Sequence, residues 1–466
     1  MNNNNNNNTE LSATLFNKYH RLDQPYYSYP TQEQFQHSVS SFARFSALRA
    51  SRKAQRPLAL NINIPFSANA CYYSTTKNII TKDRSRSAAY VHSLEQEIRL
   101  VGKHAGTKQH IEHLHFGGGT PTFLNPNELR QLMACLKDSF NIGSNNFTHY
   151  SIDIDPREVD WSTMGVLRDI GFNRVNIEVQ GLDPSVQRAI NRLQSIEQTQ
   201  NIVEAARALQ FRTVSISLIC GLPRQTPQSF RQALSDIVKL APDHISLQNF
   251  KHQPSKYPLQ THINAQDLPS SAALVEMLGS AQHILSTAGY IYIGMGHFTL
   301  ADDDLLSAQE DKALQHGIQG YTSGSDFDTI GFGVSAISQL GELYYHNTHD
   351  LRAYQTASSN QQLAPARGLL CNTDDQIRRS IIQALTCQFS VDLCSIEQRF
   401  NINFKEYFHP QWQTLKLMHD DGLLILSDKA LEMTEQGRLF TLAVCQVFDY
   451  YFSQQRQSNT AQTQVI

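Results

Sequence analysis

Apolar runs of strand length alternate with amphipathic helical runs from residue 58 to about residue 295. The runs typical of strands are residues 58–64, 110–116, 149–154, 174–179, 213–219, 244–249 and 290–295. Between them lie helical patterns, among them residues 88–101, 126–140, 196–209, 229–240 and 272–287. Alternation of this kind predicts an α/β domain in which right-handed crossovers close a parallel sheet into a full or partial barrel.

The pattern changes on both sides of this block. Residues 1–56 form an N-terminal extension, and we expect residues 1–10 to be disordered because Asn2 to Asn8 is a polar low-complexity run. Residues 368–466 are mainly helical, with helices expected at 374–385, 396–408 and 412–420. Two short apolar runs and a final helix follow, which is typical of a winged-helix layout.

Winged-helix domains often bind DNA, but the charge of this region argues against a phosphate-binding face. From Arg367 onward there are nine Lys or Arg residues against eleven Asp or Glu residues. We therefore expect a domain that covers or packs against the barrel, and no nucleic-acid partner.

The composition is that of a soluble globular protein. The chain has 466 residues, of which 40% are hydrophobic and 17% charged, and its formal net charge is −3. No apolar run approaches the roughly 18 residues of a membrane span, and the N-terminus lacks a secretory pattern. Seven scattered cysteines do not make a disulfide framework. We expect a cytoplasmic protein that does not bind membranes.

Two loops that follow predicted strands hold the residues best suited to chemistry. The first loop contains Ser67, Cys71 and Ser74, and the second is Gly117-Gly-Gly-Thr120. Glycines let a backbone approach a ligand closely, although three in a row can also be only a flexible turn. Because βα barrels gather their chemistry at the carboxyl ends of the strands, we expect the loops to be adjacent, within about 15 Å.

These residues and their spacing resemble the radical S-adenosylmethionine (SAM) enzymes, and specifically the family of oxygen-independent coproporphyrinogen III oxidases. In that family the first loop reads Cys-x3-Cys-x2-Cys, and its three thiolates hold a [4Fe–4S] cluster with one iron open for SAM. The same spacing here reads Ser67, Cys71 and Ser74, and Thr76 stands where the family has a further cysteine. The resemblance implies a partial barrel at residues 57–300, a segment at 301–367 that returns to the active site, and a C-terminal lid domain.

The resemblance also implies a tetrapyrrole substrate, a monomeric protein and a set of SAM contacts. The contact positions are Asn61, Tyr73, Gly118, Gly119, Thr120, Asp153, Gln180, Arg192, Ser217, Lys251 and Ile337. Several of them depart from the family: Asn61 replaces a tyrosine, Asp153 a glutamate and Ser217 an aspartate. Outside this set, Asn63 replaces a histidine and Gly296 an aspartate. The departures gather at cluster ligands and at polar positions that face the cofactors, whereas scaffold segments keep the family pattern.

A [4Fe–4S] cluster needs three or four soft thiolate ligands, and a serine hydroxyl is a hard, neutral and poor substitute. One thiolate from Cys71 does not hold a cluster firmly. The remaining cysteines show no ligand spacing that replaces the missing pair; they are Cys135, Cys220, Cys371, Cys387, Cys394 and Cys445.

Three functions are open on the sequence alone. The first, which we favour, is a catalytically impaired paralogue that keeps the barrel and serves as a binding or regulatory protein. The second is an active coproporphyrinogen III dehydrogenase, which would use a SAM-derived radical to convert two propionates into vinyl groups. The third is a SAM-dependent protein with non-radical chemistry, for which the sequence reveals no nucleophile–base constellation.

Overall fold

The computed structural model describes residues 13–19, 28–106, 109–143, 148–317, 320–324 and 326–454. The expectation of disorder at residues 1–10 lies outside these ranges.

The central feature is a curved sheet of 13 strands that stays open at both edges. Its middle contains the parallel strands β2 (Leu58–Ile64), β5 (Ile111–Gly118), β6 (His149–Ile154), β7 (Arg174–Gln180), β8 (Thr213–Cys220) and β9 (His244–Asn249). All of them lie close to their predicted bounds. On the far side of β2 the strand β14 (Asp328–Phe332) adds one more parallel neighbour.

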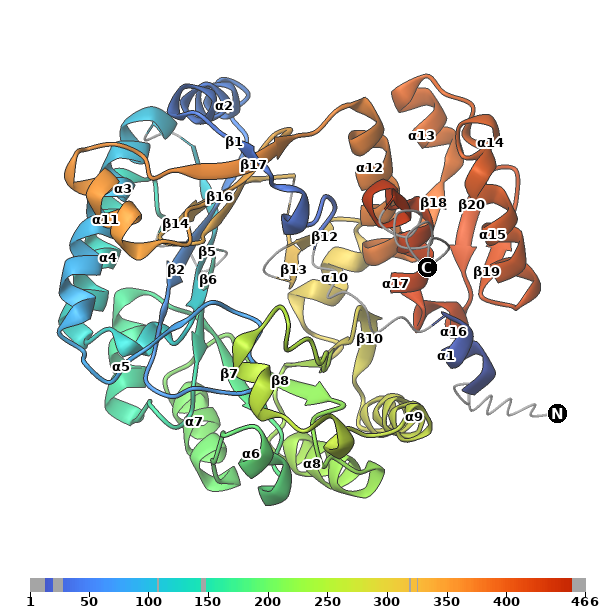
Figure 1. Cartoon of the computed structure of the whole chain (residues 1–466), viewed down its shortest axis with the longest axis horizontal. Coiled ribbons are helices and arrows are strands. Elements are labelled where there is room, and N and C mark those ends of the chain that lie inside the picture. Colours follow the sequence, from blue (N-terminus) through green and yellow to red (C-terminus); the bar gives the residue numbers. More distant parts are fainter. Residues whose placement is uncertain are drawn as a thin grey trace, which may run out of the picture.

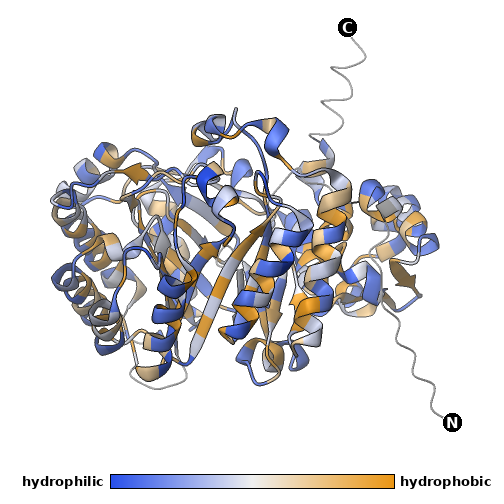
Figure 2. Ribbon diagram, turned by 90° about the horizontal axis from the view of Figure 1, so that it is seen from below, coloured by the Kyte–Doolittle hydropathy of each residue, from blue (hydrophilic) through white to orange (hydrophobic). Residues whose placement is uncertain are grey.

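Helices cover the convex face of this sheet, as Figure 1 shows. They include α3 (Arg86–Ala105), α4 (Pro126–Ser139), α5 (Trp161–Ile170), α7 (Ile196–Ala208), α8 (Pro227–Lys239) and α9 (Ser271–Thr287). Capping residues determine where some of these helices begin. At the start of α4, for example, Asn125 and Glu128 form a capping box. In Figure 2 these helices carry both hydrophilic and hydrophobic colours, as expected for helices with one buried face.

The core of this domain lies between the helices and the outward-facing strand residues. Leu60, Phe116, Ile152, Ile177 and Ile216 are fully buried there. Because strand side chains alternate between faces, the residues between them point into the concave side of the sheet. That side is therefore free to be polar.

The predicted strand at residues 290–295 is present as β10 (Ile291–Gly294), but it is not a further parallel barrel strand. The strand β11 (His297–Thr299) inserts between β9 and β10 and pairs antiparallel with both. The chain reverses through Gly294, Met295 and Gly296, all of which have positive φ. The resulting hairpin ends the run of parallel strands.

The segment that follows continues the opposite edge of the sheet. Its antiparallel strands are β15 (Ile337–Leu340), β16 (Leu343–Asn347) and β17 (Ala366–Leu370), with β1 (His37–Ser38) at the edge. The same segment also contains α10 (Asp304–Glu310), β12 (Leu314–Gly317), β13 (Gly320–Ser323) and α11 (Leu351–Ser359). Earlier in the chain, the elements not yet named are α2 (Ser41–Lys53), β3 (Phe66–Ser67), β4 (Ile79–Ile80) and α6 (Pro184–Ala189).

The C-terminal elements pack around a second hydrophobic core, which includes Ile377, Leu385, Phe408 and Phe448. They are α12 (Thr373–Gln388), α13 (Leu393–Phe400), α14 (Phe404–Tyr407), α15 (His409–Asp420), α16 (Glu435–Arg438), α17 (Thr441–Phe448) and a small sheet of β18 (Ser390–Asp392), β20 (Ala430–Met433) and β19 (Leu424–Leu426). The single helix predicted at 396–408 is wrong, because Asn401 adopts a left-handed conformation that ends α13.

The N-terminal helix α1 (Ala13–Tyr19) lies against this region, as Figure 1 shows. The Lys18 ammonium is 2.5 Å from the carboxylate of Asp421. No helix in the described part of the chain has the length and apolar character needed to cross a membrane.

Candidate functional site

At the carboxyl end of the barrel the glycine loop lies directly against the strand residues that lead into the first loop. The backbone N–H of Gly119 donates to the carbonyl of Ile64, and that of Thr120 to the carbonyl of Phe66, both at 2.7 Å. A Cβ at Gly119 would collide with the Phe66 carbonyl, and one at Gly118, whose φ is 106°, with the Asn63 side chain. The predicted adjacency is confirmed, and the glycines are needed for this close contact between loops.

The side chains at the three cluster positions each make other contacts. The Cys71 thiol lies 3.7 Å from Nη2 of Arg157 and 3.8 Å from Nη1 of Arg192. Asn78 donates to the Ser67 hydroxyl at 3.3 Å, and the Ser74 hydroxyl is 2.9 Å from that of Thr76.

This donor set does not fit a [4Fe–4S] cluster. It offers one thiol, which faces two guanidinium groups, and two hydroxyls that iron binds poorly. Within the ranges that the structure describes, no three His, Cys, Asp or Glu side chains are grouped so as to hold a metal ion.

The guanidinium groups beside Cys71 belong to a buried ion cluster. Asp155 accepts from Arg157 at 2.6 Å and from Arg192 at 2.9 Å, and Arg192 also donates to the backbone carbonyl of Glu178. Burial pulls the pKa of Asp155 upward, but the hydrogen bonds and charges of the two arginines outweigh it and hold that pKa below its ordinary value. Asp155 is thus a buried carboxylate between two cations.

A cavity of about 490 Å³ occupies the concave side of the sheet. The barrel strands give it a polar wall with every second residue, such as His149, Ser151 and Asp153 on β6. Apolar residues from other elements close the opposite side, among them Phe298 of β11 and Phe440 just before α17. The cavity is therefore amphipathic.

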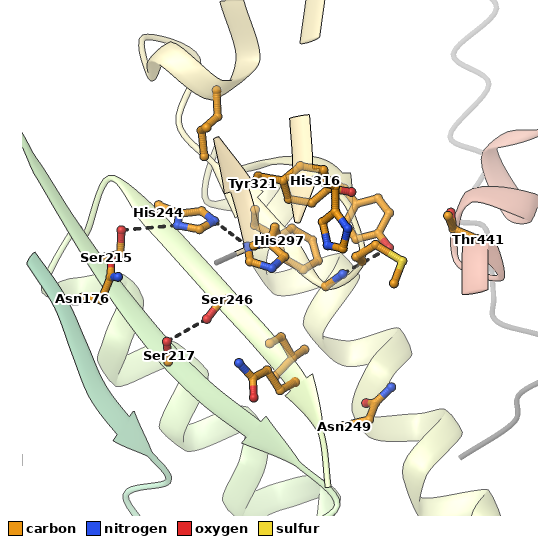
Figure 3. Close-up of a pocket in the computed structure, with 18 of the residues that line it drawn as sticks. Asn176, Ser215, Ser217, His244, Ser246, Asn249, His297, His316, Tyr321 and Thr441 are labelled. Carbon is orange, nitrogen blue, oxygen red and sulfur yellow. Dashed lines mark hydrogen bonds between the residues drawn. The ribbon is translucent and has the colours of Figure 1, made fainter. Parts of the chain in front are cut away.

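Neutral histidines dominate the part of the polar wall shown in Figure 3. Burial lowers the pKa of His244 and of His316 to about 4, so both imidazoles are uncharged at neutral pH. Nε2 of His244 is 3.0 Å from Nδ1 of His297, and its Nδ1 is 3.3 Å from the Ser215 hydroxyl. Ser215, His244 and His297 therefore form a chain of hydrogen-bonding groups along the wall.

The structure brings only some of the predicted SAM contacts to this cavity. Asp153, Ser217 and Lys251 line it, together with Gly296. Asn61 lines a separate cavity of about 60 Å³. The other predicted contacts are not among the residues that line the large cavity in the described part of the chain; they are Tyr73, Gly118, Gly119, Thr120, Gln180, Arg192 and Ile337. Their role in SAM binding stays a prediction.

Comparisons with known proteins identify the family. The Radical SAM superfamily profile matches residues 64–237, and the HemN C-terminal domain profile matches residues 372–440. Over 439 residues the chain is 48% identical to the oxygen-independent coproporphyrinogen III oxidase of Pseudomonas aeruginosa, covering 94% of this chain and 95% of the relative. This chain belongs to the oxygen-independent coproporphyrinogen III oxidase family. The Escherichia coli K12 enzyme of the same name is 36% identical over 441 residues, which is 94% of this chain and 95% of that one.

A solved structure of the family agrees with the fold. The structure of coproporphyrinogen III oxidase (HemN) from Escherichia coli, a radical SAM enzyme, superposes on this one with a TM-score of 0.89 at 36% identity, over 94% of this chain and 99% of that one. The predicted fold class, a partial barrel with a mainly helical C-terminal domain, is confirmed. SAM and a [4Fe–4S] cluster are the cofactors that this family implies.

One constellation on the cavity wall was not predicted from the sequence. Nδ1 of His115 is 2.8 Å from the Ser151 hydroxyl, and Nε2 of His115 is 3.3 Å from Oδ2 of Asp153. The sequence alone had revealed no such grouping of a hydroxyl, an imidazole and a carboxylate. Part of this grouping could have been predicted, because Ser151 and Asp153 lie on the same face of one predicted strand and His115 lies on the preceding strand. What the sequence lacked was the register that places His115 opposite Ser151.

Glu178 of β7 also lines the cavity, close to this constellation. Burial raises its pKa to about 7, with the negative charges of Asp153 and Asp155 adding to the effect and the charge of Arg192 opposing it. Glu178 therefore changes its protonation state near neutral pH.

We expect this titration to appear in the stability of the protein. A carboxyl whose folded pKa exceeds its unfolded value stabilises the fold at low pH and loses that contribution as pH rises through the folded pKa. Between about pH 4.5 and 7 the unfolding free energy of the wild type should fall relative to Glu178→Gln, by at most about 1.4 kcal/mol per pH unit. Urea unfolding of both proteins from pH 5 to 8 measures this. Parallel curves for the two proteins would contradict it.

Proposed function

We propose that this member of the coproporphyrinogen III oxidase family has lost radical SAM catalysis and acts as a binding or regulatory protein with a tetrapyrrole-sized cavity. The observation that carries the proposal is the state of the cluster loop. Ser67 and Ser74 occupy two of the three ligand positions, and the thiol of Cys71 faces Arg157 and Arg192.

The chemistry of iron–sulfur ligation supports this proposal. Such clusters are held by thiolates, and a single thiolate leaves too few strong bonds to retain one. The Cys71 thiol, the one thiol at the three ligand positions, is in contact with Arg157 and Arg192 and not with a second thiol. Any iron that approached would therefore meet one weakly placed ligand.

The cavity supports a retained ligand. Its volume of about 490 Å³ lies in the usual range for small-molecule sites, and it joins a polar wall to an apolar one. A tetrapyrrole has the same division, since its macrocycle is apolar and its acid side chains are polar. The curved sheet and the C-terminal residues Leu439 to Ala443 together enclose this space.

One observation favours an active coproporphyrinogen III dehydrogenase instead. The chain keeps 48% identity to the Pseudomonas aeruginosa oxidase over nearly the whole length of both proteins. Sequence similarity of this extent often accompanies shared activity, so this alternative requires a direct test of the cluster.

Anaerobic reconstitution with iron and sulfide separates the two functions. We expect far less than one [4Fe–4S] cluster per chain after desalting, because only Cys71 offers a thiolate in the loop. Iron and acid-labile sulfide analysis measures the result, with the Pseudomonas aeruginosa relative treated identically as the control. A full cluster in this chain, with product formed from coproporphyrinogen III, would establish the dehydrogenase.

We also expect the purified, metal-free protein to bind SAM weakly or not at all. In radical SAM enzymes the open iron holds the amino and carboxylate groups of SAM, so a pocket without it lacks the strongest contacts. In addition, Ser217 offers a neutral hydroxyl where the family has a carboxylate. Isothermal titration calorimetry measures this directly. A dissociation constant in the micromolar range would contradict the prediction.

A further inference from the structure

We propose that Ser151, His115 and Asp153 form a nucleophile–base–carboxylate triad that hydrolyses small esters or thioesters entering the barrel cavity. This activity is independent of SAM and of any cluster. It rests on three side chains that neighbouring strands hold together, all of which line the cavity.

The backbone fixes the geometry of the triad. His115 on β5 is paired in register with Ser151 on β6, and Asp153 lies two residues further along β6 on the same face. The His115 ring therefore bridges the two, with Nδ1 at 2.8 Å from the Ser151 hydroxyl and Nε2 at 3.3 Å from Asp153. Sites on regular strands hold such positions better than loops do.

The carboxylate is held in its charged form. Burial raises the pKa of Asp153, but the charge that His115 carries when it is protonated and the hydrogen bonds from His115 and Asn176 outweigh this and hold the pKa below its ordinary value. Asn176 donates to the other carboxylate oxygen at 2.9 Å, which fixes the orientation of Asp153. Asp153 accepts the Nε2 proton of His115, so the Nδ1 lone pair faces the hydroxyl of Ser151.

A second serine–histidine pair in the same cavity lacks this third member. The Ser215 hydroxyl is 3.3 Å from Nδ1 of His244, but Nε2 of His244 faces His297 instead of a carboxylate. Burial lowers the pKa of His244 to about 4, which makes it a poor base at neutral pH. The structure thus contains its own comparison between a complete triad and an incomplete one.

The reaction follows from the positions of the protons. The Ser151 oxygen bonds to the acyl carbon while its proton passes to Nδ1 of His115. The bond to the alkoxide or thiolate leaving group breaks, and that group takes the proton from His115. Water then attacks the acyl-serine with His115 as the base, which releases the acid and returns a proton to Ser151. Arg174 lines the same wall, in register with Ser151 on β7, but its guanidinium is paired with Asp304, so we assign it no part in the reaction.

The apolar part of the cavity lining selects the acyl group. It includes Leu278, Phe298 and Phe440, so an apolar acyl chain would be accommodated beside them. We therefore expect short acyl esters of uncharged alcohols or thiols to be better substrates than esters of dicarboxylic acids.

Labelling with an alkyl fluorophosphonate tests the nucleophile on the full-length, metal-free protein. We expect one adduct per chain, located by peptide mass spectrometry on Ser151 and absent from Ser215. Ser151→Ala should abolish the adduct, and Ser395→Ala, on the surface of the C-terminal domain, should keep it. No adduct on the wild type, or an adduct at Ser215, would overturn the proposal.

Hydrolysis of p-nitrophenyl butyrate tests the whole triad. We expect Ser151→Ala to lower kcat/KM at least about 100-fold. Asp153→Asn, which keeps the shape of the side chain, should lower kcat with little change in KM, because Asp153 positions His115 and does not touch the ester. Circular dichroism confirms folding of each variant. Equal rates for the wild type and Ser151→Ala would refute the triad, whatever the iron analysis shows.

Discussion

Replacing Ser67 and Ser74 together by cysteine is expected to let the protein bind a [4Fe–4S] cluster, which the wild type should hold poorly if our proposal is right. With Cys71 the variant presents three thiolates at the family spacing, enough for a cluster with one open iron. Serine and cysteine differ little in size, and the wild-type serines lose only hydrogen bonds to Asn78 and Thr76. The Cys71 thiol must also turn away from the two arginines.

The iron content and the visible and electron paramagnetic resonance spectra of the reconstituted variant measure the gain. The single variants Ser67→Cys and Ser74→Cys are the matched controls, and each should hold a cluster poorly with only two thiolates.

Decarboxylation should still be slow in the double variant, because Asn61, Ser217 and Gly296 remain altered and misplacement of reacting groups lowers rates steeply. A wild-type protein with a stoichiometric, SAM-responsive cluster would show that the serines do not prevent ligation.

The sequence predicted the parallel strands because their side chains are apolar toward the helices and the runs are short. It did not predict the end of the parallel run, which depends on the positive φ angles of Gly294, Met295 and Gly296. Glycine permits such a reversal without requiring it, so a glycine pair at the end of an apolar run is compatible with either outcome.

The contacts between side chains on the cavity wall were also beyond prediction from the sequence. The position of Asp153 on a strand was evident from the sequence, but its contact with His115 depends on the register of two strands about forty residues apart. Register is set by packing across the whole sheet and not by local residues. For this reason candidate ligand positions were easier to predict from the sequence than pairs of interacting side chains.

The glycine loop has a structural role that does not depend on a cofactor. Gly118 and Gly119 allow two loops to pack against each other, and that contact does not depend on a bound ligand. Fold stability therefore accounts for these glycines even in a protein without a cluster. The ion cluster of Asp155, beside Cys71 of the other loop, is a second structural feature that needs no bound ligand.

Asp155→Asn is expected to destabilise the protein by about 3 to 5 kcal/mol. The side chain of Asp155 is only 5% exposed, and those of Arg157 and Arg192 are 13% and 2% exposed. Asparagine keeps the shape of aspartate but removes the carboxylate that bonds both guanidinium groups, which is much costlier than losing a surface pair. Urea unfolding at pH 7 measures the difference.

The matched control is Asp428→Asn, because Asp428 pairs with Lys405 on the surface, where their side chains are 91% and 52% exposed. That change should cost no more than about 1 kcal/mol. The pKa of Asp155 lies below its ordinary value, so its contribution to stability is present above the unfolded pKa and is lost as pH falls through the folded pKa. The gap between wild type and Asp155→Asn should therefore narrow in acid. Equal losses for the two variants at pH 7 would mean that water or other side chains solvate Arg157 and Arg192, and that the ion cluster does not hold the loop.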